Sequence, residues 1–414
     1  MSTVHKFESE PRPFKIEISD KELEELQDRL DRTRWPLVDC VPDDFSDDER
    51  LNMFGCGPGP TLELMKELVN DWRHKYDWRK AEAELNKLPH FKVNIEGLNL
   101  HFIHQKSTRQ DAIPLILCHG WPGSFDEFTH IIPLLTNPPS DKDLAFHVVV
   151  PSQPGFTFSD PPRSHTHTMD DTARMFDKLM TGLGYETYAA QGGDWGSVTA
   201  RLLGSTHQQH CRAVHLNFLP VLNPLMKIIP PRLLIQYLPN FLLPPLERER
   251  GKRALDYLEK GSSYYAMQHN TPRTPAYGLN DSPVGLLAWI AEKMISYIDM
   301  ASQITKPQGP PTLTRDALFN HVSLYWFTHS IGTSFSPYAF NRHFAEFVSD
   351  SKYFLPNLGI SIFPWEIVVS ALKDMKRTGN VKWYKEADQG GHYAALENPH
   401  LLAEHLRDAF KVLW

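Results

Sequence analysis

The run Gly192-Gly193-Asp194-Trp195-Gly196 has the spacing of a sharp G-x-S-x-G turn between a strand and a helix, with aspartate at the central position. A β-rich run, residues 186–190, leads into the turn, and a helix-forming run, residues 197–203, leaves it. Because glycine has no Cβ, the backbone can turn tightly there and leave the side chain of Asp194 exposed above the sheet. The alternative is an ordinary glycine-rich loop in which Asp194 caps the following helix.

An aspartate at this turn predicts a reaction at carbon. A serine that attacked an sp³ carbon would end as an ether, which the site could not easily break. A carboxylate that does the same becomes an ester, and water can hydrolyse the ester and restore the carboxylate. Asp194 therefore indicates a displacement, such as the opening of an epoxide or the expulsion of a halide.

The bulk composition fits a globular enzyme. The chain has 414 residues, of which 41% are hydrophobic and 22% are charged. This length allows two or three domains or one elaborated α/β domain with a large core. A net charge of −7 offers no electrostatic footprint for nucleic acid.

The four cysteines are too few and too scattered for a disulfide framework or a zinc site. They are Cys40, Cys56, Cys118 and Cys211. We expect them to be reduced packing residues, which fits a reducing compartment.

The sequence predicts no integral membrane segment. Residues 1–8 lack an apolar stretch, so we expect neither a signal peptide nor an anchor. No window approaches the roughly 20 apolar residues of a spanning helix. The most apolar stretch, residues 233–246, is broken by Pro239, Pro244 and Pro245, and we expect it to be buried or to line a tunnel, with membrane contact as the alternative. These features favour a cytoplasmic protein.

Apolar and alternating runs predict a series of strands separated mostly by helical stretches. That alternation implies a mainly parallel sheet of the α/β class. The predicted strands cover residues 90–95, 98–103, 114–118, 146–150, 187–191, 213–216, 360–363 and 381–384.

Four parts follow along the chain: an N-terminal extension (1–95), a first core half (96–221), an inserted helical lid (222–345) and a second core half (346–414). The lid is rich in proline, tyrosine and methionine, contains helical patterns such as 283–296, and has no convincing strand.

The extension contains an extended run and two amphipathic helices. Residues 14–18 are extended, and Ser19 is a good N-cap for a helix over residues 21–33. A second helix is predicted over residues 62–71. Their apolar stripes must be buried, and we expect them to pack on the back of the core.

Hydrolysis of an ester on Asp194 would pass through an oxyanion that needs N–H donors. The first should be the backbone amide of Trp195, the residue after the nucleophile. The second should come from residues 119–124, His-Gly-Trp-Pro-Gly-Ser, which follow the strand that ends at Cys118. We assign it to Trp121; the alternative is a simple Gly-Pro turn.

A base and an orienting acid should follow the nucleophile in the order acid, then histidine. His392 lies in a glycine-bearing loop after the last predicted strand, and we expect it to be the base. Glu366 follows the penultimate strand and would hold the tautomer of His392. Asp374 is the other candidate for this acid.

An epoxide oxygen leaves as a strongly basic alkoxide, so it needs a donor that stays protonated at neutral pH. Tyrosine, with a pKa of about 10, suits this role. The lid offers Tyr264, Tyr265 and Tyr338, among fourteen tyrosines in the chain.

Over nearly its whole length the chain resembles the microsomal-type epoxide hydrolases of the α/β-hydrolase fold, including soluble fungal and juvenile-hormone members. The resemblance lies in residues 76–80 (Tyr-Asp-Trp-Arg-Lys), the His-Gly-Trp-Pro loop, the Gly-Gly-Asp turn, residues 280–286 (Asn-Asp-Ser-Pro-Val-Gly-Leu) and residues 390–392 (Gly-Gly-His). It implies an α/β-hydrolase fold with an inserted lid and an N-terminal extension.

The resemblance also implies the roles of the site residues. Asp194 would be the nucleophile, His392 the base and Glu366 the charge-relay acid. Tyr265, six residues before Thr271, would be one proton donor, with its neighbour Tyr264 as the alternative. Tyr338, twelve residues after Trp326, would be the other donor.

The expected reaction converts an epoxide and water to a vicinal diol, without metal or organic cofactor, in detoxification or the catabolism of aromatic compounds. The expected partners are the substrate and water, with a homodimer left open. A haloalkane dehalogenase with the same nucleophile and a non-catalytic binding protein of this fold are the alternatives.

Overall fold

The computed structural model describes residues 6–41, 59–221, 230–298, 314–341 and 353–414. Within these ranges, nine strands form one sheet in the order β1-β2-β3-β5-β4-β6-β7-β8-β9. The strands β1, β2, β3 and β5 pair antiparallel in turn, and every pairing from β5 through β4 to β9 is parallel. The bounds are β1 Arg12–Phe14, β2 His90–Ile95, β3 Leu98–Gln105, β4 Ile113–Cys118, β5 Phe146–Pro151, β6 Tyr188–Gly192, β7 Cys211–Leu216, β8 Leu355–Ile362 and β9 Gly379–Glu386. The predicted, mainly parallel sheet is confirmed.

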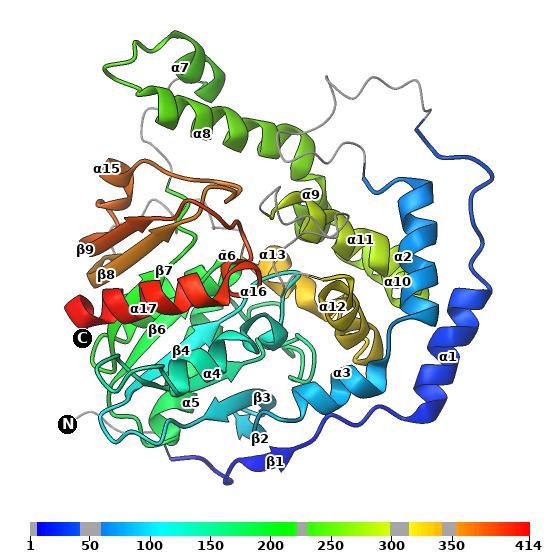
Figure 1. Cartoon of the computed structure of the whole chain (residues 1–414), viewed down its shortest axis with the longest axis horizontal. Helices are drawn as coiled ribbons and strands as arrows, with labels where there is room; N and C mark the ends of the chain where they lie inside the picture. The colour runs from blue at the N-terminus through cyan, green and yellow to red at the C-terminus, as the bar shows by residue number, and fades with distance from the viewer. Residues whose placement is uncertain (1–5, 42–58, 222–229, 299–313, 342–352) are drawn as a thin grey trace.

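Two pairs of helices pack on this sheet (Figure 1). The first pair, α4 (Ile131–Thr136) and α17 (Pro399–Leu413), lies in front of the strands in that view. The second pair is α5 (Met169–Gly182) and α6 (Asp194–Thr206). Because helices cover the central strands, these strands are largely buried, and four of the six residues of β4 are fully buried.

The lid lies beyond the carboxyl ends of the parallel strands (Figure 1). Its described parts, 230–298 and 314–341, contain helices and no strand, as the sequence predicts. The helices are α7 Pro231–Tyr237, α8 Pro245–Asp256, α9 Ser263–Asn270, α10 Arg273–Asp281, α11 Pro283–Ser296, α12 Arg315–Phe327 and α13 Ser336–Phe340.

The helices of the extension pack on the lid, and the expectation that they cover the back of the core is wrong. Helices α1 (Asp20–Asp31) and α2 (Leu62–His74) contact α11, while α2 and α3 (Trp78–Leu85) contact α12. Trp72 stacks on Phe319 and donates a hydrogen bond from Nε1 to the Ser323 hydroxyl (3.1 Å). The apolar stripe of the extension therefore completes the core of the lid.

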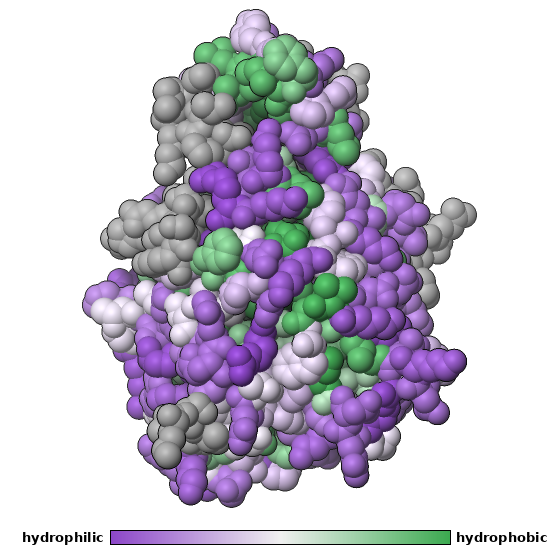
Figure 2. Space-filling view, turned by 90° about the vertical axis from the view of Figure 1, so that its left-hand side faces the viewer, coloured by the Kyte–Doolittle hydropathy of each residue, from purple (hydrophilic) through white to green (hydrophobic). Residues whose placement is uncertain are grey.

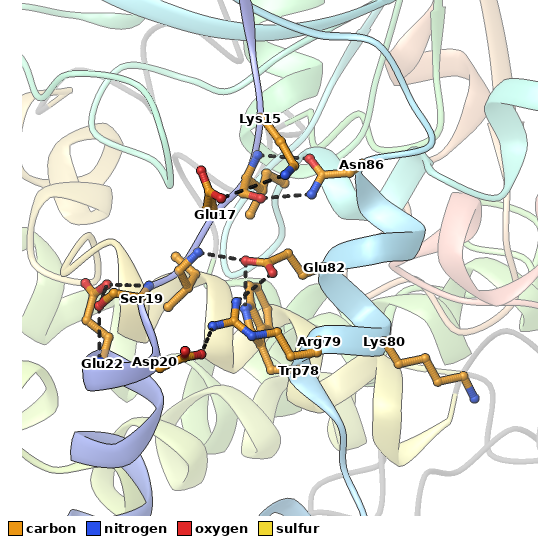
Figure 3. Close-up of polar contacts among 12 residues, drawn as sticks. Lys15, Glu17, Ser19, Asp20, Glu22, Trp78, Arg79, Lys80, Glu82 and Asn86 are labelled. Atoms are coloured by element: carbon orange, nitrogen blue, oxygen red, sulfur yellow. Dashed lines mark hydrogen bonds and ion pairs between the residues drawn. The ribbon is translucent and has the colours of Figure 1, made fainter.

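Side chains of α3 and of its C-cap residue, Asn86, hold the extended segment before α1 (Figure 3). The Asn86 side chain accepts a hydrogen bond from the Ile16 N–H (2.9 Å) and donates one to the Ile16 carbonyl (2.8 Å). Glu82 accepts a hydrogen bond from the Ile18 N–H (2.7 Å). Ser19 caps α1 in a capping box with Glu22, as its position before the apolar stripe predicts.

Most of the apolar segment 233–246 is exposed, although Leu234 and Ile235 are buried, so the expectation of a buried or tunnel-lining segment is wrong for most of its length. Tyr237 is 69% exposed and Phe241 is 83% exposed. Together with Leu233, Leu242 and Leu246 they form an apolar surface at the tip of the lid, at the top of Figure 2. The prolines turn the chain between α7 and α8, and this loop projects away from the body of the lid (Figure 1).

Three of the four cysteines, Cys40, Cys118 and Cys211, are described, and all three are free. Cys56 lies outside the described residues. Within the described ranges, no helix combines the length and apolar character needed to cross a bilayer.

Replacement of Asn86 should loosen the extension. In Asn86→Ala two backbone groups of the buried residue Ile16 lose their partner, so the free energy of unfolding should fall by about 1–3 kcal/mol. Urea denaturation followed by circular dichroism measures this change. Lys80→Ala is the matched control, because Lys80 is an exposed residue of the same segment and points away from these contacts (Figure 3). Equal urea midpoints for both variants would contradict the assigned role of Asn86.

Candidate active site

Asp194 stands at a strained turn between β6 and α6. Its φ is +47°, a left-handed conformation that is uncommon for residues other than glycine. The neighbouring glycines make the turn possible: a Cβ on Gly196 would lie 1.9 Å from the Cys118 carbonyl oxygen, and one on Gly192 would lie 2.1 Å from the Gly196 carbonyl oxygen. The turn therefore packs directly against the end of β4, and Asp194 is the first residue of α6.

The loop after β4 presents a backbone donor to the Asp194 carboxylate. The Trp121 N–H donates a hydrogen bond to Asp194 Oδ1 (2.8 Å). His119 supports the loop, because its Nε2 accepts from the Gln153 N–H (3.1 Å) and its Nδ1 contacts the Gly120 carbonyl oxygen (3.0 Å). Burial lowers the pKa of His119 to about 4, so the ring is neutral and can accept. The Trp195 amide lies in the first turn of α6, where N–H groups have no carbonyl partner in their own helix.

His392 lies between two carboxylates. Its Nδ1 is 2.6 Å from Glu366 Oε1, and its Nε2 is 3.4 Å from Asp194 Oδ2. The side chains of His392 and Glu366 are 3% and 1% exposed, so this pair is almost entirely shielded from water. The geometry thus joins Asp194, His392 and Glu366 in one line, with each nitrogen of the ring facing one carboxylate.

The loops that carry His392 and Glu366 are tied together. Trp365 forms a parallel β-bridge with Gly391, and its N–H donates to the Gly390 carbonyl (3.1 Å). From the lid side, the Tyr297 carbonyl accepts from the His392 N–H (2.9 Å). Asp374, the other candidate acid, lies in α15 (Leu372–Met375) and pairs with Arg377 at 3.6 Å.

The two carboxylates decide the charge of His392. Burial alone would lower the pKa of the ring, but the charges of Glu366 and Asp194 and their hydrogen bonds outweigh burial and raise the pKa of His392 well above its usual value. The two carboxylates therefore favour the protonated form of the ring. Loss of the charge on Asp194 would remove one of the two opposing charges, so the pKa of His392 would fall.

The predicted tyrosines gather on the lid side of Asp194. The ring of Tyr338 lies 5.0 Å from Trp195 and 5.8 Å from Trp121, and its buried hydroxyl has no hydrogen-bond partner among the described residues. Tyr264 stacks on Trp121 at 5.3 Å, and its hydroxyl lies 3.1 Å from that of Tyr257. Tyr265 is only partly buried, and its ring lies 5.2 Å from Tyr338.

Burial and nearby charge keep these hydroxyls protonated. Burial, aided by the charge of Asp194, raises the pKa of Tyr338 well above its usual value. Burial and the neighbouring tyrosines do the same for Tyr264. A smaller rise at Tyr265 comes from burial and Asp194. All three can therefore donate a hydrogen bond throughout the neutral range.

A small cavity lies on the core side of Asp194. The space open to the centre of a water molecule has a volume of about 20 Å³, which is enough to hold one water molecule. Asp194, His392, Glu127, Asn217 and Tyr393 contribute to its walls. Sequence reasoning missed Glu127 and Asn217. Glu127 lies only six residues after Trp121 in the same segment, and this closeness in sequence could have indicated that it lies near the site.

Comparisons with known proteins match nearly the whole chain. Residues 11–128 match the family model described as "Epoxide hydrolase N terminus", and residues 113–242 match the model of the alpha/beta hydrolase fold. Epoxide hydrolase 1 of Sus scrofa is 34% identical over 422 residues, which cover 96% of this chain and 87% of that protein.

Two solved structures share the architecture. The Aspergillus niger epoxide hydrolase has a TM-score of 0.83 at 32% identity, covering 99% of this chain and 98% of that one. The juvenile hormone epoxide hydrolase of Bombyx mori has a TM-score of 0.84 at 26% identity, with the same coverage.

Neutralising Asp194 should lower the pKa of His392. In Asp194→Asn the attraction of one carboxylate is lost while burial remains, so the ring should release its proton at lower pH than in the unmodified protein. NMR titration of labelled histidine measures this pKa, with the His392 signal assigned by its loss in His392→Gln. Asp388→Asn removes an exposed carboxylate from the same loop and should leave the titration unchanged. Equal pKa values of His392 in the unmodified protein, Asp194→Asn and Asp388→Asn would contradict the assigned pairing of His392 with Asp194.

Proposed function

The chain belongs to the epoxide hydrolase family, and from this premise we propose that it converts epoxides to vicinal diols through a covalent ester on Asp194. The observation that carries the proposal is the alignment of Asp194, His392 and Glu366, with distances of 3.4 and 2.6 Å along the chain of contacts. This is the geometry of a nucleophile followed by a base and its orienting acid.

In the first step, Asp194 attacks one ring carbon while tyrosine hydroxyls on the lid side donate to the epoxide oxygen. One C–O bond of the ring breaks, the new ester bond forms, and the oxygen leaves as a hydroxyl group after it takes a tyrosine proton. The unpartnered hydroxyl of Tyr338 supports its assignment as one donor, because a buried donor without a partner costs free energy that a substrate oxygen would recover.

For the second donor, the contacts support Tyr264 over the sequence assignment, Tyr265. Tyr264 is 6% exposed and stacks on Trp121, the residue whose amide binds Asp194. Its hydroxyl is held by that of Tyr257, which would keep it aimed. Tyr265 also contacts Tyr338, with ring centroids 5.2 Å apart, but it is less buried than Tyr264.

In the second step, water attacks the carbonyl carbon of the Asp194 ester. The ester is neutral, so the pKa of His392 falls. The proton of the ring then passes to the tyrosinate that the first step leaves, and the neutral Nε2 can accept a proton from the attacking water. The amides of Trp121 and Trp195 hold the oxyanion. When the intermediate collapses, the diol oxygen takes the proton from His392. The carboxyl group of Asp194, which now carries one oxygen from water, then passes its remaining proton to Nε2, and this restores the carboxylate and the protonated ring.

The reaction assigns no step to a metal or organic cofactor. The cytoplasmic location and a homodimer stay predictions. A haloalkane dehalogenase would need N–H donors around a halide, whereas hydroxyls gather on the lid side of Asp194. A parallel assay of styrene oxide hydrolysis and chloride release from a haloalkane separates the two reactions.

Variants of the nucleophile and the base should stop the reaction at different points. Asp194→Ala should form no diol above the uncatalysed rate, because no ester can form. His392→Gln should form the ester and fail to hydrolyse it, so intact mass should rise by the mass of one epoxide molecule. The double variant is the control and should carry no adduct.

Solvent isotope labelling provides the second measurement. In water enriched in ¹⁸O, the unmodified enzyme should acquire the label in Asp194, detectable by peptide mass spectrometry. A His392→Gln variant that turns over normally, or an Asp194 that stays unlabelled over many turnovers, would rule out the ester mechanism.

Phenylalanine variants should distinguish the donors. Tyr338→Phe and Tyr264→Phe should each slow ester formation by about 100-fold, the usual order for loss of a general acid. Tyr265→Phe is the matched variant and should change the rate by less than about threefold, since a peripheral hydroxyl contributes little. Stopped-flow fluorescence of Trp121 and Trp195 would follow ester formation. The reverse ranking of Tyr264→Phe and Tyr265→Phe would return the role to Tyr265.

A further inference from the structure

The cavity on the core side of Asp194 holds a carboxyl group to which the two-step reaction assigns no role. Glu127 belongs to the short 3-10 helix η2 (Phe125–Phe128), which follows the loop that carries Trp121. Its side chain lines the same water-sized cavity as Asp194 and His392. The remaining polar wall includes Asn217, whose Oδ1 is already occupied by the Gln191 side chain (2.7 Å).

The local backbone is shaped to admit this carboxyl group. A Cβ built on Gly123 would lie only 1.2 Å from Glu127 Oε1 and 2.4 Å from its Cδ. The carboxyl group of Glu127 therefore occupies the space that any larger residue at position 123 would fill. Gly123 is itself held, because its carbonyl accepts a hydrogen bond from the Tyr325 hydroxyl (2.7 Å).

We propose that the cavity is the site of the hydrolytic water, and that Glu127 positions this water between His392 and the carbonyl carbon of the Asp194 ester. The inference rests on the proposed ester mechanism. Its basis is the shared cavity, its size and the fold of Glu127 over Gly123.

The chemistry of the step requires a partner of this kind. The attacking water donates one hydrogen to Nε2 of His392, and its lone pair points to the ester carbon. Its second hydrogen needs an acceptor, and a carboxyl oxygen of Glu127 provides it. The proton count of the second step is unchanged, because Glu127 only accepts a hydrogen bond.

The charge state of Glu127 suits this position. Burial, and next the charge of Asp194, raise the pKa of Glu127 to about 8, while His392 opposes the rise. The group is therefore mostly protonated at neutral pH. A neutral carboxyl group accepts through its carbonyl oxygen without placing a second negative charge beside Asp194.

The test separates ester formation from ester hydrolysis in single-turnover experiments with styrene oxide. Glu127→Met should leave ester formation within about threefold and slow hydrolysis by about 10-fold or more, the effect expected for loss of one hydrogen bond at the reacting water. The ester should then accumulate in the intact-mass spectrum. Glu127→Gln keeps a carbonyl acceptor and should restore hydrolysis to within about threefold of the unmodified enzyme.

Asp126→Asn is the matched control for a purely structural effect. Asp126 is a buried carboxyl group of the same 3-10 helix, but it faces His321, 3.8 Å away, on the other side of the segment. Its replacement should leave the ratio of the two rates unchanged. Equal slowing of both steps in Glu127→Met, or equal rates for the Met and Gln variants, would overturn the proposal.

A second variant tests the same site without altering Glu127. Gly123→Ala should displace the carboxyl group of Glu127 and slow hydrolysis of the ester as Glu127→Met does. In a Glu127→Ala background, Gly123→Ala should slow hydrolysis little further, since the clash between the two side chains is gone. Fully additive effects of the two substitutions on the rate of ester hydrolysis would contradict the model of a shared water site. If the unmodified enzyme forms no ester at all, the proposed function fails; if it forms one and Glu127→Met does not retain it, only this inference fails.

Discussion

The left-handed backbone at Asp194 is the constraint on which the site depends. It turns the chain from β6 into α6 within one residue and leaves the carboxylate facing the amide of Trp121. The turn needs glycines because the carbonyl of Cys118 approaches it so closely. Since parallel strands end at the same edge of a sheet, the loops after β4, β6, β8 and β9 then meet at this carboxylate.

The charges at that edge form an alternating series that changes during the reaction. The ring of His392 lies between two carboxylates, whose charges compensate for the burial of the ring. In the proposed mechanism, formation of the ester removes one negative charge and thereby turns the same ring into a base. A buried, shielded histidine can thus serve both steps without any movement of Glu366, which is fixed by the Ile367 amide at 2.8 Å.

Much of this could be predicted from the sequence, and the failures share a cause. Apolar runs identify strands, and chain order identifies the loops that carry Asp194, Glu366 and His392. Periodicity predicts an apolar stripe on α2 but not its partner, so the packing on the lid was missed. Adjacent residues of a helix differ by about 100° in direction, so the proposed choice of Tyr264 over Tyr265 rests on tertiary contacts that no sequence pattern provides. The fold of Glu127 over Gly123 likewise depends on a side-chain conformation that no pattern records.

The extension contacts two parts of the molecule: β1 is an edge strand of the sheet, while α1 to α3 pack on the helices of the lid. A hinge motion of the lid would separate large aromatic side chains such as Trp72 from the residues they pack on. This would cost about 1.5–3 kcal/mol for each buried side chain that becomes exposed. We therefore expect the substrate to enter and the product to leave through rearrangements of individual side chains and short loops, while the lid helices keep their position over the site.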